Sequence, residues 1–296
     1  MRFYSEYYAI RFFLFLTSFL PISTTYTLCK GIARLLFKIG KRRRKLTLSN
    51  LKLAFPEKSE QEREQLAQKA YESVAITLAE TLLMYNERFD IDAAITNKDD
   101  ILKQLEHHLK NNPRGTILPT GHFSNWELLA QFVAKNGYPF KNIARRGNNH
   151  LVDEHIIQAF RGRYGNNHIY KKNAIVSLVK TLKEGGIVSM MFDQKIEDAH
   201  SVPTTFFNHP VRTLSTIAQL KLKYNPDVFP TFTARLPNGK YKIIMYETVN
   251  DSPAKNEITE ETTTEMTQRY NNVLEKLIRE YPEQWFWMHN RWRLPK

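Results

Sequence analysis

The sequence is short of cysteine, of long apolar runs and of acidic side chains. A single cysteine, Cys29, among 296 residues excludes an intramolecular disulfide framework and fits a reducing compartment. A mean hydropathy of −0.48 excludes a polytopic membrane protein, because each span needs about 20 predominantly apolar residues. The chain is nevertheless 42% hydrophobic, which is enough for the core of one large α/β domain or of two small ones.

The shortage of acid leaves 43 basic residues against 30 acidic ones, a formal net charge of +13. Such a surface attracts polyanions: nucleic acid, anionic lipid headgroups or an acidic carrier protein. Charge alone does not choose between the three. The sequence has no zinc-finger spacing, RNA-binding aromatic signature or helix-turn-helix pattern, so we expect no nucleic-acid partner.

The most membrane-like region lies at the N-terminus. The run "FFLFLTSFLPI" (12–22) is too short to span, and its extension towards Cys29 adds hydroxyl residues. It lacks a short charged start and a small-residue cleavage site, so we expect no cleaved signal peptide. An amphipathic stretch, 30–45, follows and ends in five cations that favour anionic headgroups on the cytoplasmic side. We therefore predict a membrane-anchoring helical segment over 1–45, which either spans the membrane or lies in it. The alternative is a buried helix followed by a solvated charge run.

The remainder, 46–296, has the pattern of one α/β domain. Helices are predicted over 60–88 (with Ser59 as N-cap), 99–110, 126–136, 151–163, 174–184 and 257–281. Strands are predicted over 115–120, 142–145, 185–192 and 228–235. This alternation predicts a mostly parallel central sheet flanked by helices. The pair Asn238–Gly239 is a hairpin signal, so the last strands are expected to be antiparallel.

The stretch "TGHFSNWELLA" (120–130) places His122 and Glu127 at the end of the first predicted strand. The two residues can be a base with its orienting carboxylate, two metal ligands, or an ordinary helix start. Five residues on a regular helix rotate by about 140°, so the pair would not share a helical face. If His122 precedes the helix, its ring can fold back towards Glu127, which would fix the tautomer and stabilise the imidazolium.

Two further strand ends carry polar side chains. Arg145 and Arg146 follow the second predicted strand, and Asp193 and Gln194 follow the third. Ligand sites of α/β sheets lie beyond the carboxyl ends of the strands. A core strand needs none of these groups, so the sequence predicts a functional site at this edge of the sheet.

With these pieces in order, the chain resembles the bacterial lipid A late acyltransferases, the lauroyl/myristoyl family of the lysophospholipid acyltransferase-like group. The resemblance covers roughly 115–293. It rests on "GHFSNWE", on Arg145 with Asn149 and Asp153, and on "FDQ", "FFNHPVRT" and "PEQWFWMHNRW". His150 and Asn208 depart from the family pattern, which puts the choice of acceptor or chain length in doubt.

The resemblance implies transfer of a fatty acyl chain from an acyl carrier protein thioester to a hydroxyl of a lipid A precursor, a phosphorylated and acylated glucosamine disaccharide. It also implies that the protein acts at the cytoplasmic face of the bacterial inner membrane. His122 and Glu127 become the catalytic pair. Arg145, Asn149, Asp193 and Gln194 become substrate-binding or oxyanion residues. The thioester is already activated, so we expect neither a cofactor nor a metal.

Other functions stay open at this point. Within acyl transfer, the acceptor could be another lysophospholipid or glycolipid, and the donor a coenzyme A thioester. From other classes, His122, Glu127 and Asp193 could be the ligands of a metal-dependent hydrolase, or the protein could be a non-catalytic basic membrane-binding protein. Glu127 could also be a first-turn acid favoured by the helix dipole, and Arg145 a surface cation.

Overall fold

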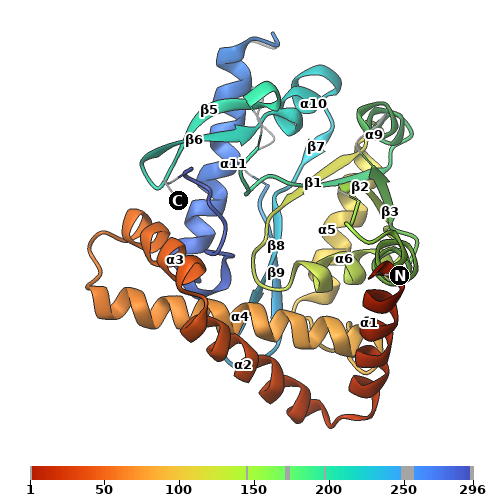
Figure 1. Cartoon of the computed structure of the whole chain (residues 1–296). Coiled ribbons are helices and arrows are strands. Elements are labelled where there is room, and N and C mark those ends of the chain that lie inside the picture. Colours follow the sequence, from red (N-terminus) through yellow and green to blue (C-terminus); the bar gives the residue numbers. More distant parts are fainter. Residues whose placement is uncertain (1, 145, 171–173, 197, 248–256, 294–296) are drawn as a thin grey trace.

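A parallel sheet with helices on both faces carries the candidate site, and a layer of N-terminal helices lies at one end of the molecule (Figure 1). The computed structural model describes residues 2–144, 146–170, 174–196, 198–247 and 257–293. Its α-helices are α1 (Arg2–Phe19), α2 (Ile22–Ile39), α3 (Lys41–Ala54), α4 (Glu60–Tyr85), α5 (Lys98–Asn111), α6 (Trp126–Lys135), α7 (His150–Val152), α8 (Ala159–Arg161), α9 (Ala174–Lys183), α10 (Thr216–Tyr224) and α11 (Glu260–Glu280).

The strands form one large sheet and two hairpins. They are β1 (Thr116–Thr120), β2 (Phe140–Ala144), β3 (Asn167–Tyr170), β4 (Ile187–Met191), β5 (Ser201–Phe206), β6 (His209–Leu214), β7 (Asp227–Val228), β8 (Thr231–Arg235) and β9 (Tyr241–Met245). The large sheet has the order β3-β2-β4-β1-β7, and its strand pairs are all parallel. The predicted α/β architecture with a mostly parallel sheet is therefore confirmed.

The central strands are apolar on both sides because both faces of the sheet are covered. On β1, Ile117 belongs to the hydrophobic cluster that includes residues of α9, α10 and α11. Its neighbour Leu118 belongs to the second cluster, with residues of α5 and α6. Successive side chains of one strand point to opposite faces of the sheet and thus belong to two separate hydrophobic clusters.

Several predicted elements are confirmed, and others differ for identifiable reasons. Helix α4 begins after Ser59, whose side chain forms a capping box with Glu62. The Asn238–Gly239 turn joins β8 to β9 as an antiparallel hairpin. The strand predicted over 228–235 is instead two strands, β7 and β8. They are separated at Pro230, which has no amide proton for a ladder.

Other parts of the fold differ from the predicted elements or were not predicted from local patterns. The helix predicted over 151–163 consists of α7, a π-helical stretch (Asp153–Gln158) and α8. Strand β3, the β5–β6 hairpin, α3 and α10 were not predicted. Tertiary packing rather than local periodicity determines these elements.

The N-terminal helices are part of the core as well as of the surface. Cys29, Ala33 and Phe37 of α2 belong to the same buried cluster as residues of α4. The boundary predicted between residues 45 and 46 lies inside α3. Among the described residues, no helix combines the length and the apolar content that crossing a membrane requires.

A buried carboxylate connects this helical layer to the sheet. Glu80 of α4 is 2% exposed and accepts hydrogen bonds from Tyr26 of α2 (3.1 Å) and Asn125 before α6 (2.7 Å). It also accepts from Arg235 (3.1 Å) and Tyr241 of the β8–β9 hairpin. Five segments of the chain therefore meet at the carboxylate of Glu80, which is almost completely removed from water.

We expect Glu80→Ala to lower the free energy of unfolding by about 3–5 kcal/mol, because it leaves Arg235 buried without its counter-ion. Urea denaturation followed by circular dichroism measures the change. The matched control is Glu72→Ala, which removes a partly exposed α4 carboxylate paired with Arg34 on the surface. Glu72→Ala should lower the free energy of unfolding by at most about 1 kcal/mol. Equal losses in the two variants would contradict a special role for Glu80.

Candidate active site

The sheet register brings His122 and Asp193 together. Strands β1 and β4 are neighbours, and Thr120 of β1 pairs with Met191 of β4. His122 and Asp193 each lie two residues beyond that pair, so they meet at the carboxyl edge. The Nδ1 atom of His122 lies 2.9 Å from Oδ1 of Asp193, and the backbone amide of His122 donates to Oδ2 at 2.8 Å.

This close approach requires Gly121. A Cβ at that position would lie 3.0 Å from Cγ of Asp193 and 3.2 Å from its Oδ2. The carboxylate occupies the space that a side chain would need. Gly121 therefore allows the backbone before the histidine to pass directly over the buried aspartate.

The C-terminal segment holds the aspartate from the other side. Trp285, 1% exposed, donates its indole N–H to Oδ2 of Asp193 at 3.0 Å. Buried Arg291 donates to the backbone carbonyl of Gln194 at 3.1 Å. Both the carboxylate and the residue after it are thereby fixed by the final segment of the chain.

The same segment also fixes the histidine loop. The amide of Phe286 donates to the carbonyl of His122 at 3.0 Å, and the amide of Ser124 donates to the carbonyl of Gln284 at 2.6 Å. Ser124 has a φ of 51°, in the left-handed region that non-glycine residues seldom adopt. The clamp sustains this backbone conformation, which turns His122 out of the strand before α6 begins.

Electrostatics assign the proton on the imidazole. Burial alone would lower the pKa of His122, but the charge and hydrogen bond of Asp193 outweigh it and raise the pKa above its ordinary value. Asp193 shows the complementary effect: burial opposes its ionised form, yet His122 holds the pKa of the carboxyl below its ordinary value. Because an ionised carboxylate only accepts, Nδ1 carries the proton in the neutral ring, and the lone pair of that ring lies on Nε2.

Glu127 is not the hydrogen-bond partner of His122, and this part of the predicted arrangement is wrong. Its carboxylate accepts both Nε (3.0 Å) and Nη2 of Arg161, and also the indole N–H of Trp126 at 3.2 Å. Asn125 caps α6 by accepting from the amide of Leu128, so Glu127 already lies on the helix. His122 precedes the helix, and its Nδ1 faces Asp193 while the carboxylate of Glu127 faces Arg161.

Arg161 is the site residue that sequence reasoning missed. It belongs to α8, beyond the irregular π-helical stretch, where no periodic pattern indicated its direction. Its guanidinium forms a fork with Glu127 and still lines the cavity beside His122. Burial opposes the charge of Arg161, but Glu127 outweighs that effect and raises the pKa of the guanidinium. The site therefore contains a permanent cation on the same cavity wall as His122.

The remaining predicted site residues have different places. Asn149 caps α7 and donates to the carbonyl of Phe3 (2.8 Å) and to Glu6 (3.1 Å), so its amide connects α1 to the sheet edge instead of facing the cavity. Gln194 contributes its backbone carbonyl to Arg291, and its side chain is half-buried. Arg145 lies outside the described residues.

No group of three metal-ligating side chains occurs in the described part of the chain.

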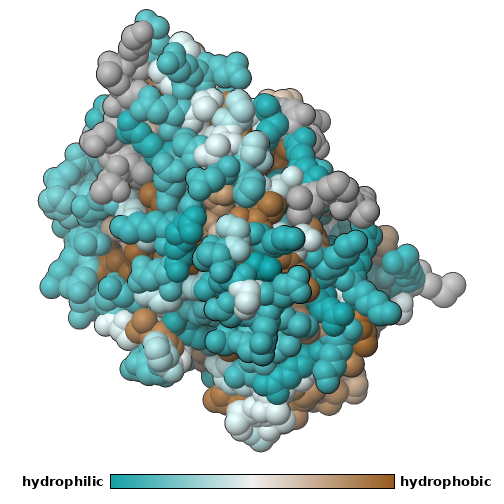
Figure 2. Space-filling view, turned by 90° about the vertical axis from the view of Figure 1, so that its left-hand side faces the viewer, coloured by the Kyte–Doolittle hydropathy of each residue, from teal (hydrophilic) through white to brown (hydrophobic). Residues whose placement is uncertain are grey.

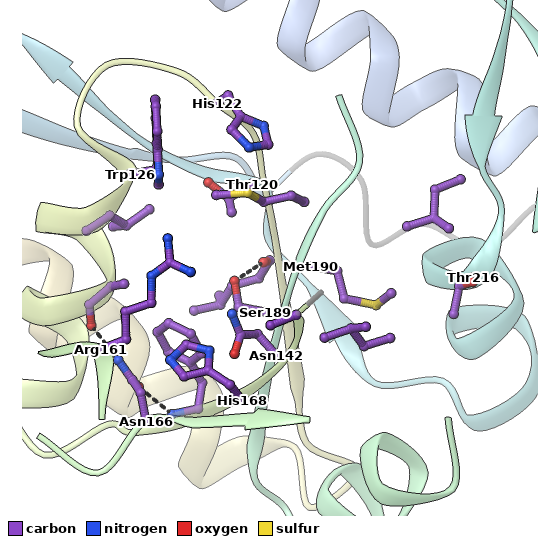
Figure 3. Close-up of a pocket in the computed structure, with 18 of the residues that line it drawn as sticks. Thr120, His122, Trp126, Asn142, Arg161, Asn166, His168, Ser189, Met190 and Thr216 are labelled. Atoms are coloured by element: carbon purple, nitrogen blue, oxygen red, sulfur yellow. Dashed lines mark hydrogen bonds between the residues drawn. The ribbon is translucent and has the colours of Figure 1, made fainter. Parts of the chain in front are cut away.

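A cavity of about 780 Å³ opens beside His122 (Figure 3). Its lining is mostly apolar and includes Leu129, Val133 and Phe140 on the α6 side of the sheet. Trp126 forms an edge-to-face contact with His122, with ring centroids 5.1 Å apart, and both side chains line the cavity. The volume and the mostly apolar lining suit an aliphatic chain, and an imidazole forms part of the wall.

Comparisons with known proteins agree with this geometry. A family model described as "Bacterial lipid A biosynthesis acyltransferase" matches residues 1–294. A lipid A biosynthesis lauroyltransferase of Escherichia coli (strain K12) is 30% identical over 279 residues, 93% of this chain and 87% of the relative. The palmitoleoyltransferase of the same organism is 26% identical, over 86% of this chain and 79% of the relative. Its myristoyltransferase is 24% identical, over 87% and 77%.

Removing the charge of Asp193 should reverse the direction of the His122 pKa shift. We expect NMR titration to give a His122 pKa above 6.5 in the native protein and below 6.5 in Asp193→Asn, where burial is the dominant remaining effect. Asp99→Asn, which removes an exposed carboxylate of α5, is the control and should leave the pKa of His122 unchanged. A pKa that stays above 6.5 in Asp193→Asn would show that another group holds the proton.

Proposed function

The chain belongs to the bacterial lipid A biosynthesis acyltransferase family, and we propose that it transfers a fatty acyl chain from an acyl carrier protein thioester to a hydroxyl of a lipid A precursor. The observation that carries the proposal is the His122–Asp193 pair, whose histidine lines a mostly apolar cavity. An imidazole with a free Nε2 is the base that an alcohol needs, and the cavity suits the chain that the alcohol receives.

The chemistry follows from the free lone pair. Nε2 of His122 takes the proton of the acceptor hydroxyl as its oxygen attacks the thioester carbonyl carbon. The tetrahedral intermediate then expels the thiolate, the C–S bond breaks, and the proton on Nε2 passes to the departing sulfur. Asp193 stabilises the imidazolium that exists between these steps, in the role of the third member of a catalytic triad.

Arg161 and Glu127 are proposed to act as a unit on the other side of the base. The guanidinium is held by Glu127 at a fixed position on the cavity wall, where it can stabilise a developing oxyanion or a substrate phosphate. The negative charge of Glu127 also raises the pKa of His122, after the larger contribution of Asp193. Glu127 is therefore proposed as a positioning residue that acts through Arg161 instead of as the orienter of His122.

The carrier-protein donor is supported by charge. A chain with a net charge of +13 should meet an acidic carrier protein faster than a neutral one would, and most strongly at low salt. Enzymes that complete lipid A act at the inner membrane, so both the donor and the lipid acceptor are expected at its cytoplasmic face.

The test is an assay of purified protein with a lipid A precursor and a choice of acyl carrier protein or coenzyme A thioesters, read by mass spectrometry of the lipid. We expect one added acyl group, faster from the carrier protein. His122→Ala should lose about 10²–10⁴-fold in rate, the share that general base catalysis supplies. Asp193→Asn should lose a comparable share, and the double variant little more, because the two residues act together.

Three results would count against the proposal. One is full activity of His122→Ala, and another is independent, multiplying losses in the double variant. The third is acylation of a lysophospholipid in preference to the lipid A precursor, which would change the acceptor. His107→Ala, an exposed histidine of α5, is the control for a non-specific effect of losing an imidazole and should retain full activity.

We also propose that residues 1–45 attach the protein to the membrane surface. Fifteen exposed large hydrophobic side chains lie on α1 and α2, against six elsewhere in the described chain. Figure 2 shows hydrophobic atoms along the lower edge of the molecule, at the height where Figure 1 places α2. The five consecutive cations 41–45 are the first residues of α3, directly after α2, where anionic headgroups would meet them.

Substitution at this surface should release the protein from lipid. Phe12 is 62% exposed on α1, and we expect Phe12→Glu to weaken binding to anionic vesicles by about tenfold or more, since it removes a large apolar side chain from the lipid. Vesicle sedimentation measures the effect. Val176→Glu on α9, where the side chain is 72% exposed, makes the same charge change and should bind nearly as the native protein does. Equal weakening by both variants would indicate that charge alone governs attachment.

A further inference from the structure

A row of polar side chains crosses the central sheet inside the cavity. The register pairs Ser189 of β4 with Asn142 of β2, and Asn142 with His168 of β3, so the three lie at one level. All three line the cavity, and Figure 3 shows them next to one another. The buried strands of a parallel sheet are usually apolar at such positions. This row therefore requires an explanation beyond packing.

Several atoms of the row have no protein partner. The side-chain oxygen of Asn142 and both ring nitrogens of His168 are buried without a hydrogen bond to any described residue. Burial lowers the pKa of His168, so near neutral pH the ring has one donor and one acceptor. Ser189 donates to the carbonyl of Leu118 and can still accept. Groups of this kind are satisfied by whatever the cavity holds, and ordered water is the usual occupant.

The row lies apart from the proposed base along the strand direction. Ser189 pairs with Leu118, two positions before Thr120, and His122 follows two positions after Thr120. At about 3.3 Å per residue, the row is on the order of 10 Å from the histidine loop along the strand direction. In Figure 3, His122 occupies one end of the view, and Asn142 and His168 lie towards the other.

We propose that the row Ser189–Asn142–His168 determines the length of the acyl chain that the enzyme accepts; this inference rests on the proposed function. The chain extends from His122 along the α6 side of the sheet, and its methyl end stops where water bound to the row begins. A longer chain displaces that water. The free energy gained by burying one more methylene is smaller than the free energy of the hydrogen bonds that the polar groups then lose. The longer chain is therefore rejected.

The test replaces the polar groups by apolar ones of similar size. Asn142→Leu and His168→Leu, in the full chain, are compared with the native enzyme on saturated acyl carrier protein thioesters of increasing length. We expect kcat/KM for a donor two carbons beyond the native optimum to rise about tenfold relative to the optimal donor, the factor that two buried methylenes supply. Ile175→Ala, on the α9 side of the cavity, should leave the length preference unchanged.

A measurement on the native enzyme keeps the inference testable if a row variant does not fold. A donor two carbons too long should be transferred faster when its end carries a hydroxyl, because the hydroxyl replaces the displaced water. An unchanged length preference in both row variants, or no benefit from the terminal hydroxyl, would overturn the inference. A shifted preference in Ile175→Ala would place the chain on the α9 side and overturn it too. Inactive native enzyme would instead refute the proposed function.

Discussion

The contact between His122 and the buried carboxylate of Asp193 is the interaction on which the site depends. A fully buried carboxylate is costly unless its charge is balanced and its oxygens are hydrogen-bonded. Here the imidazole, the backbone amide of His122 and the indole of Trp285 supply three donors. The same contact sets the tautomer of the histidine and leaves Nε2 free. The arrangement that satisfies the buried charge is therefore also the one that would prepare His122 for its proposed role as a base.

That contact is supported from regions that are remote in the chain. Gly121 leaves room for the carboxylate, and the segment around Trp285 holds both members of the pair. The buried Glu80 connects Asn125, at the start of α6, to α2 and to the β8–β9 hairpin. A site placed on strand ends and locked by a surrounding network needs little reorganisation during a reaction, which is the basis of electrostatic preorganisation.

The layout of the molecule also bears on how a lipid substrate reaches the cavity. The sheet, α6 and α9 all contribute residues to the cavity wall, while the exposed apolar side chains gather on α1 and α2. Helix α1 contacts the cap of α7 through Asn149, so the proposed membrane-facing layer is joined to the edge of the sheet that carries the site. An enzyme built in this way could take its acceptor from the membrane surface, as proposed above.

Local sequence patterns were sufficient for much of the fold and for the location of the site. Periodicity and caps predicted α4, α6, α9 and α11, and the turn at Asn238–Gly239 predicted the last hairpin. Each of these patterns depends on residues that are close together in the chain. Polar residues after apolar strands likewise predicted that His122 and Asp193 lie at the same edge of the sheet, because the carboxyl ends of parallel strands share one edge. Only the tertiary structure decided that Asp193, and not the nearby Glu127, faces Nδ1 of His122. The order β2-β4-β1 places the end of β4 beside that of β1, and strand order follows from which faces can be buried together. For the same reason the direction of Arg161, the structural role of Asn149 and the row Ser189–Asn142–His168 became evident only in the folded protein, where residues of three separate strands share one register.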